Sequence, residues 1–105
     1  MHLVLPLIAA SVLLVWDASP VPDVVLYRLY VGIQSLRAGN PPLTGYSTQK
    51  AQFQVDGLDY GTDYFFCVTA INLAGLESEY SNEVQYTPTP APEPTPKPGK
   101  GFWSY

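Results

Sequence analysis

The chain has little of the residue types that build metal sites, disulfides or nucleic-acid interfaces. Its 105 residues include one cysteine and one histidine. No disulfide can therefore form within the chain, and neither a multi-histidine metal site nor a histidine-based catalytic triad can be assembled from it alone. Five Lys and Arg stand against nine Asp and Glu, for a net charge of −4. Because phosphates require a basic surface, this balance argues against a nucleic-acid partner.

Recognisable catalytic arrangements are also missing. Serine and threonine are present without an activating base, and no glycine-rich phosphate loop occurs. Carboxylates gather around one turn (Asp56, Asp59, Asp63) and in the segment "ESEYSNE" (Glu77, Glu79, Glu83). The aspartates could bind a divalent cation or act as an acid–base pair, but turns favour aspartate because its side chain caps nearby N–H groups. We expect the glutamates to be solvated, and we expect no enzyme, metal or cofactor.

The chain does contain a succession of short apolar alternations typical of β-strands. The inward residues that they predict are Val12, Leu14 and Trp16 in "SVLLVWD", Tyr27, Leu29 and Val31 in "VVLYRLYVG", Phe53 and Val55 in "AQFQVDGL", Tyr64, Phe66, Val68 and Ala70 in "TDYFFCVTAIN", and Val84 and Tyr86 in "SNEVQYT". Turn formers such as "ASPVPD" and "RAGNPPLTG" separate these segments, and no helical periodicity occurs. The pattern predicts an all-β antiparallel sandwich.

Residues 1–10, "MHLVLPLIAA", are almost wholly apolar and allow two interpretations. They could be a short signal-like segment, although no Lys or Arg precedes the apolar run. They could instead form an edge strand or strap, in which Pro6 is tolerated because its missing N–H would face solvent. The run is too short to span a bilayer, so we expect no membrane span.

Residues 88–105 form a proline-rich tail with an aromatic end. A proline stands at every second position from Pro88 to Pro98, which favours polyproline II and a reach of roughly 35 Å at about 3.1 Å per residue. Phe102, Trp103 and Tyr105 follow. Three such side chains could anchor the chain in a partner, because each buries a large apolar area. The alternative is a plain linker.

A candidate contact patch lies on the outward face of the predicted sheet. Tyr30 and Phe65 should project outward on neighbouring strands, with Arg28 and Cys67 beside them. Interfaces are enriched in Tyr, Phe and Arg, so we interpret this group as a partner contact, against the alternative of incidental exposure. Cys67 is either an inert strand residue or a thiol that pairs between chains.

The segment "GLDYGTDYFFCVTAIN", with the strands around it, resembles a fibronectin type III domain of the bacterial and phage kind over residues 11–87. The resemblance implies an immunoglobulin-like sandwich, with Trp16 as a core tryptophan and Leu58 filling the core below a turn. It also implies a tyrosine corner, in which the Tyr64 hydroxyl bonds to the backbone near Leu58. Tyr60 departs from the family pattern, which has proline there.

The resemblance also implies a class of function. Domains of this family serve as spacers, adhesive modules and assembly parts. We expect a non-catalytic structural or interaction module on an extracellular, cell-surface or virion assembly, with the tail as tether or anchor and a protein partner, which could be another copy of the chain. The alternative is an accessory module of a secreted polysaccharide-degrading enzyme, since Pro/Thr-rich linkers join such modules to catalytic domains.

Overall fold

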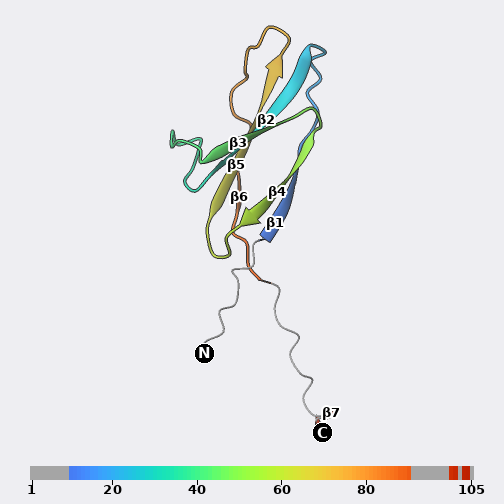
Figure 1. Cartoon of the computed structure of the whole chain (residues 1–105), viewed down its shortest axis with the longest axis vertical. Helices are drawn as coiled ribbons and strands as arrows, with labels where there is room; N and C mark the ends of the chain where they lie inside the picture. Colours follow the sequence, from blue (N-terminus) through green and yellow to red (C-terminus); the bar gives the residue numbers. More distant parts are fainter. Residues whose placement is uncertain (1–9, 91–99, 102, 105) are drawn as a thin grey trace, which may run out of the picture.

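The computed structural model describes residues 10–90, 100, 101, 103 and 104, and these form strands and no helix. The strands are β1 (Ala10–Val15), β2 (Val24–Gly32), β3 (Thr44–Thr48), β4 (Gln52–Leu58), β5 (Tyr64–Asn72), β6 (Val84–Tyr86), and the two-residue β7 (Lys100–Gly101) and β8 (Trp103–Ser104). Strands β1 and β4 form one antiparallel sheet, and the second has the order β3-β2-β5-β6 (Figure 1). The predicted all-β antiparallel architecture is confirmed for β1 to β6, whereas β7 and β8 pair in parallel. The predictions for residues 1–9 and for most of the tail lie outside the described residues.

The closed core lies between the two sheets. Its buried members come from one face of β2, β4 and β5, and are Leu29, Val31, Val55, Leu58, Tyr64 and Phe66. Val12 and Leu14 of β1 pack against this cluster and remain half-buried. In β2 and β5 these positions alternate with residues of the opposite face, because successive side chains of a strand point to opposite sides. In β4, Val55 and Leu58 are three residues apart because the β1–β4 register shifts between them. The period-two pattern therefore predicted the core of these strands correctly.

Burial differs from the prediction at three positions. Cys67 and Thr69, expected to face outward, are only 2% and 4% exposed. They do lie on the outer face of central strand β5, but the segments flanking the sheet cover that face. Val84, expected inward, is 45% exposed. It belongs to the three-residue edge strand β6, where a hollow of about 260 Å³, lined also by Leu14 and Phe66, leaves the end of the core open.

Trp16 lies just beyond β1 and does not belong to the closed core. Its ring is half-buried and meets Tyr27 edge to face, with 5.7 Å between ring centroids. The indole Nε1–H is buried without a hydrogen-bond partner. The central core tryptophan that the resemblance implied is therefore a side chain at one end of the sandwich, because β1 ends at Val15.

The turn between β4 and β5 has the predicted arrangement. The Tyr64 hydroxyl accepts a hydrogen bond from the Asp59 N–H at 2.8 Å, and Leu58 below it is 4% exposed. Gly61 has φ +82°, a left-handed conformation that glycine adopts without steric cost. Its N–H donates to the carbonyl of Pro88 at 2.9 Å, and Pro88 is fully buried. The packed body thus includes Pro88, one residue past the predicted boundary at residue 87.

Candidate binding surfaces

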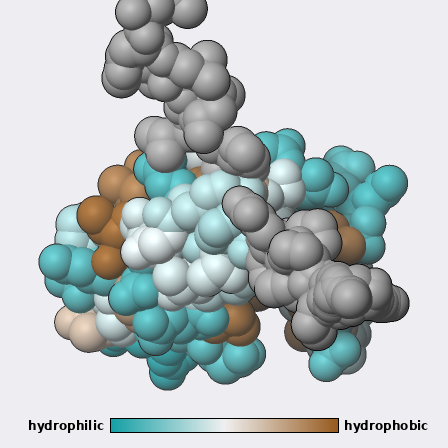
Figure 2. All heavy atoms as spheres, turned by 90° about the horizontal axis from the view of Figure 1, so that it is seen from below, coloured by the Kyte–Doolittle hydropathy of each residue, from teal (hydrophilic) through white to brown (hydrophobic). Residues whose placement is uncertain are grey.

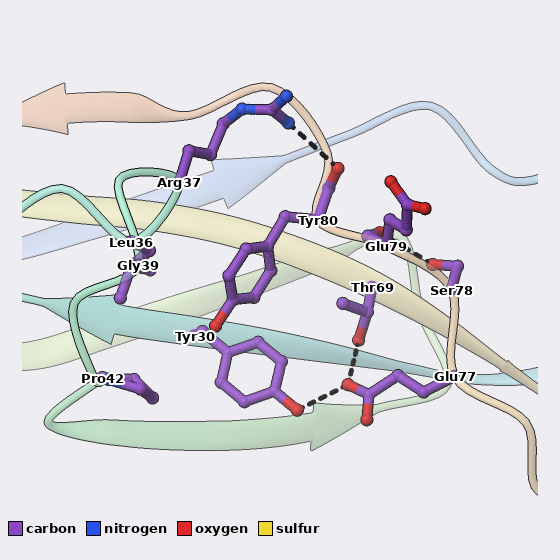
Figure 3. A pocket seen from close by; sticks show the side chains of 10 residues that line it. All are labelled: Tyr30, Leu36, Arg37, Gly39, Pro42, Thr69, Glu77, Ser78, Glu79 and Tyr80. Carbon is purple, nitrogen blue, oxygen red and sulfur yellow. Dashed lines mark hydrogen bonds between the residues drawn. The ribbon is translucent and has the colours of Figure 1, made fainter.

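A shallow groove with a volume of about 700 Å³ lies on the outer face of the four-stranded sheet. Tyr30 of β2 and Thr69 of β5 lie at its floor, and the β2–β3 loop and the segment after β5 form its sides (Figure 3). The lining residues are Tyr30, Leu36, Arg37, Gly39, Pro42, Thr69, Glu77, Ser78, Glu79 and Tyr80. We call this hollow the tyrosine groove.

Glu77 is the polar centre of the tyrosine groove. One carboxylate oxygen, Oε2, accepts hydrogen bonds from the Tyr30 hydroxyl at 2.5 Å and the Thr69 hydroxyl at 2.6 Å (Figure 3). The other, Oε1, lies 3.6 Å from the Arg28 guanidinium. These contacts join the segment after β5 to β2 and β5. Glu77 is exposed, as expected, but its carboxylate also has a structural role in these contacts.

The hydrogen bonds also shift proton affinities in the groove. The Thr69 hydroxyl, then the Tyr30 hydroxyl and the Arg28 charge, hold the pKa of Glu77 below its ordinary value. Burial, followed by the hydrogen bond to Glu77, raises the pKa of Tyr30. Both shifts favour an ionised Glu77 that accepts from a neutral tyrosine. Near neutral pH the hydrogen bond between Tyr30 and Glu77 therefore holds the segment after β5 in place.

The two sides of the groove are tied together at one end. Arg37 Nη1 donates to the carbonyls of Tyr80 and Ser81, at 3.2 and 2.8 Å. The Glu83 carboxylate accepts from the Ser35 hydroxyl at 2.9 Å and from the Arg37 N–H at 3.0 Å. Glu83, expected to be solvated, thus holds the β2–β3 loop in place. Tyr80 packs edge to face on Tyr30, with 5.4 Å between ring centroids.

Cys67 lies beneath this tied end, opposite Tyr30 in the β2–β5 register. Its sulfur is 3.9 Å from Glu83 Oε1. Burial, and next the negative charge of Glu83, raise the pKa of the Cys67 thiol to about 11. Since the thiolate is the reactive form, the inert interpretation of Cys67 is the one that this environment supports.

The structure brings together only part of the predicted contact patch. Arg28 and Tyr30 meet through Glu77, whereas Phe65 lies opposite Gly32 and Gln85, half-buried and outside the groove. The side chains of Phe102, Trp103 and Tyr105 lie outside the described part of the chain. Sequence reasoning missed Thr69, Glu77 and Tyr80 as groove residues. The alternation of acids with Tyr and Ser in "ESEYSNE" was the available indication, but only the fold shows which strand this segment crosses.

A second surface lies at the end of the sandwich where β2 begins and β5 ends, in the upper part of Figure 1. The Leu73 N–H donates to the Asp23 carbonyl at 3.0 Å and joins the two loops. Around this link four apolar side chains are exposed: Val21 (52%), Val25 (44%), Leu73 (77%) and Leu76 (68%). We call them the apolar tip. Figure 2 shows the opposite end of the molecule. The described residues visible there are mostly hydrophilic, and their hydrophobic patches are separated from one another.

The acidic turn holds ordinary hydrogen bonds. Asp56 accepts from the Ser11 hydroxyl at 2.7 Å and the Gln54 amide at 2.9 Å, and Asp63 accepts from the Thr87 hydroxyl. Among residues 10–90 and the short C-terminal strands, no cluster of His, Cys, Asp and Glu could hold a metal ion. The same residues include no helix long and apolar enough to cross a membrane.

Comparison of the chain with protein-family models, curated proteins and solved structures finds no match.

The Glu77 contacts predict a pH-dependent contribution to stability. Because the folded pKa of Glu77 is lowered, its contribution is full above the unfolded pKa, about 4.3, and is lost as pH falls through the folded value. Glu77→Gln should lower the free energy of unfolding by about 1 kcal/mol near pH 7, a value discounted for partial exposure, and by much less near pH 3. Urea unfolding at both pH values measures the difference. Glu79→Gln is the control, since no described hydrogen bond or ion pair involves that carboxylate; equal losses in both variants would contradict the assignment.

Proposed function

We propose that this chain is a non-catalytic, fibronectin type III-like interaction module that presents its apolar tip to a protein partner. The observation that carries the proposal is the position of the tip. Ala10, where β1 begins, and Tyr86, where β6 ends, lie at the end of the sandwich opposite to the tip (Figure 1). A module held through either end of its chain would thus point the tip away from its attachment.

Local geometry supports the resemblance to the family. Two antiparallel sheets of two and four strands enclose the core, Leu58 fills it below the β4–β5 turn, and the Tyr64 hydroxyl bonds to the Asp59 N–H. A tyrosine at the start of the penultimate strand, bonded to the backbone a few residues upstream, is the tyrosine corner of such sandwiches.

The apolar tip has the properties of a protein-binding surface. Burying a leucine side chain contributes about 1.5 to 3 kcal/mol, and Leu73 and Leu76 are the most exposed large apolar side chains described. Their loop is held by bonds from the Asn72 N–H to the Leu76 carbonyl at 3.1 Å and from the Leu76 N–H to Asn72 Oδ1 at 2.9 Å. A turn already ordered loses less entropy on binding.

The proposal extends to the setting of the module. We infer an extracellular, cell-surface or virion assembly, with the proline-rich segment as tether and Phe102, Trp103 and Tyr105 as its anchor. The support is physical: a tether with many prolines and few apolar residues builds no core of its own, so aromatic side chains at its end gain by burial in a partner.

Site-specific photo-crosslinking in the producing cells tests the tip. A crosslinking amino acid in place of Leu73 should form a discrete protein adduct that disappears when Leu76→Asp is added, because a charge at this position opposes apolar contact. The matched control is the same substitution at Leu43, a 61% exposed leucine whose N–H bonds to Val31 near the other end of β2. Equal adducts at both positions, or none at Leu73, would contradict the proposal. Loss of the adduct on deleting residues 101–105 would show that the anchor is needed for access to the partner.

A further inference from the structure

We propose that the tyrosine groove binds the proline-rich segment 89–98 of a second copy of this chain. The groove is separate from the apolar tip, so this inference goes beyond the proposed function and does not depend on it. It joins two features of one chain: an aromatic groove on the sandwich and a sequence that favours polyproline II.

The side chains of the groove suit a polyproline II ligand. Proline-rich segments dock into shallow grooves lined by aromatic rings, because the preformed helix loses little entropy on binding and its ring faces pack on aromatic surfaces. Tyr30 and Tyr80 provide two rings in mutual contact, and Pro42 lines the side formed by the β2–β3 loop, whereas Leu36 is buried (Figure 3). The bonds of Tyr30 to Glu77 and of Arg37 to the Tyr80 carbonyl hold this surface in place.

Charge complementarity favours one register of the segment. The Glu79 carboxylate lines the groove, and no described hydrogen bond or ion pair uses it. Polyproline II has three residues per turn, so in that conformation Pro94 and Lys97 would share a face about 9 Å apart, while Glu93 would belong to a different face. We infer that Pro94 packs on the tyrosine rings while the Lys97 ammonium meets Glu79.

The direction of β6 makes a second copy the occupant. In its antiparallel register with β5, β6 passes from Val84 opposite Phe66 to Tyr86 opposite Tyr64, and so leads away from Thr69 and the groove. Pro88 is then buried, with its carbonyl bound to Gly61. To reach its own groove the chain would have to reverse direction within a segment that has a proline at every second position and no glycine before Gly99. Such a segment is stiff over several residues, so the groove of a neighbour is the more accessible one.

A charge-exchange experiment on the full-length chain tests the pairing. Sedimentation velocity over a range of concentrations should show the mean mass of the wild-type protein rising with concentration. Lys97→Glu and Glu79→Lys should each weaken this association by about tenfold or more, because each places like charges together. The double variant should restore it. Glu79 is exposed and Lys97 belongs to the proline-rich segment, so the variants should fold. Lys100→Glu is the matched control and should associate as the wild type does.

Several results would overturn the inference. They are a wild-type chain that stays monomeric at every concentration, Lys97→Glu protein that associates normally, and a double variant that is not restored. If Trp103→Ala abolishes association while Lys97→Glu does not, the aromatic end and not the proline-rich segment is the occupant. Leu73→Asp distinguishes this contact from the apolar tip, because the variant should self-associate as the wild type does. If Leu73→Asp instead abolishes self-association, the contact belongs to the apolar tip.

Discussion

Replacing Phe66 with alanine is expected to lower the free energy of unfolding by about 3 to 5 kcal/mol. Phe66 is 2% exposed, belongs to the closed core and lies on the central strand β5, where the surrounding backbone is paired on both sides. The site therefore has little freedom to collapse around the lost ring, and a cavity remains. Since small domains are stable by only about 5 to 15 kcal/mol, this variant should be close to unfolded at physiological temperature. Urea and thermal unfolding followed by circular dichroism measure the loss.

The neighbouring residue is a matched control for this variant. Phe65 has the same side chain on the same strand, but it points to the other face and is half-buried. Phe65→Ala should cost about 1 to 2 kcal/mol, because less apolar area returns to water. A loss for Phe65→Ala as large as that for Phe66→Ala would contradict the half-buried position of Phe65.

Tyr64→Phe should lower the free energy of unfolding by about 1 to 3 kcal/mol, although it removes a single oxygen atom. The Tyr64 hydroxyl accepts the Asp59 N–H at 2.8 Å, and Tyr64 is 6% exposed. Without the oxygen, the amide donor at the β4–β5 turn loses its partner in a place that is partly closed to water. The turn should loosen before the rest of the sandwich unfolds, so amide hydrogen exchange at Asp59 should speed up by more than the global change in stability explains.

Tyr86 provides the comparison for Tyr64. It lies directly opposite Tyr64 in the β5–β6 register and packs against the same core, but its hydroxyl makes no hydrogen bond to any described residue. Tyr86→Phe should therefore be within about 0.5 kcal/mol of the wild type. Similar losses in both variants would indicate that the ring, and not the hydroxyl bond, is responsible.

The tyrosine groove and the apolar tip differ in construction. The groove is held by Glu77, Glu83 and Arg37, which link strands and loops far apart in the chain. The tip depends on the turn from Asn72 to Leu76 and on the bond between the Leu73 N–H and the Asp23 carbonyl. Substitution of the groove carboxylates should therefore change both stability and recognition, whereas substitution of Leu73 or Leu76 should change recognition alone.

The amino-acid sequence alone predicted β1, β2, β4, β5 and β6 and most of the core, but it missed β3, because Thr44 and Gly45 belong to the segment "RAGNPPLTG" that was interpreted as a turn. Alternation in "VVLYRLYVG" and "TDYFFCVTAIN" identified the inward positions Leu29, Val31, Tyr64 and Phe66 correctly, because a residue's face in a strand depends only on its parity. The resemblance implied a bond between the Tyr64 hydroxyl and the backbone near Leu58, and the Asp59 N–H makes it.

Only the tertiary structure decided what lies outside the core. Parity places Cys67 and Thr69 on the outer face, but a strand pattern does not state which loop covers that face, so their burial came from contacts with Glu83 and Glu77. Tyr30, a hydrogen-bond partner of Glu77, lies 47 residues away from it, beyond any local pattern. Val84 shows the converse case. The alternation along its strand predicts that it points inward, but the edge strand that carries it borders an open end of the core. Local chemistry determines which way a side chain points, whereas the packing of distant segments determines what it meets there.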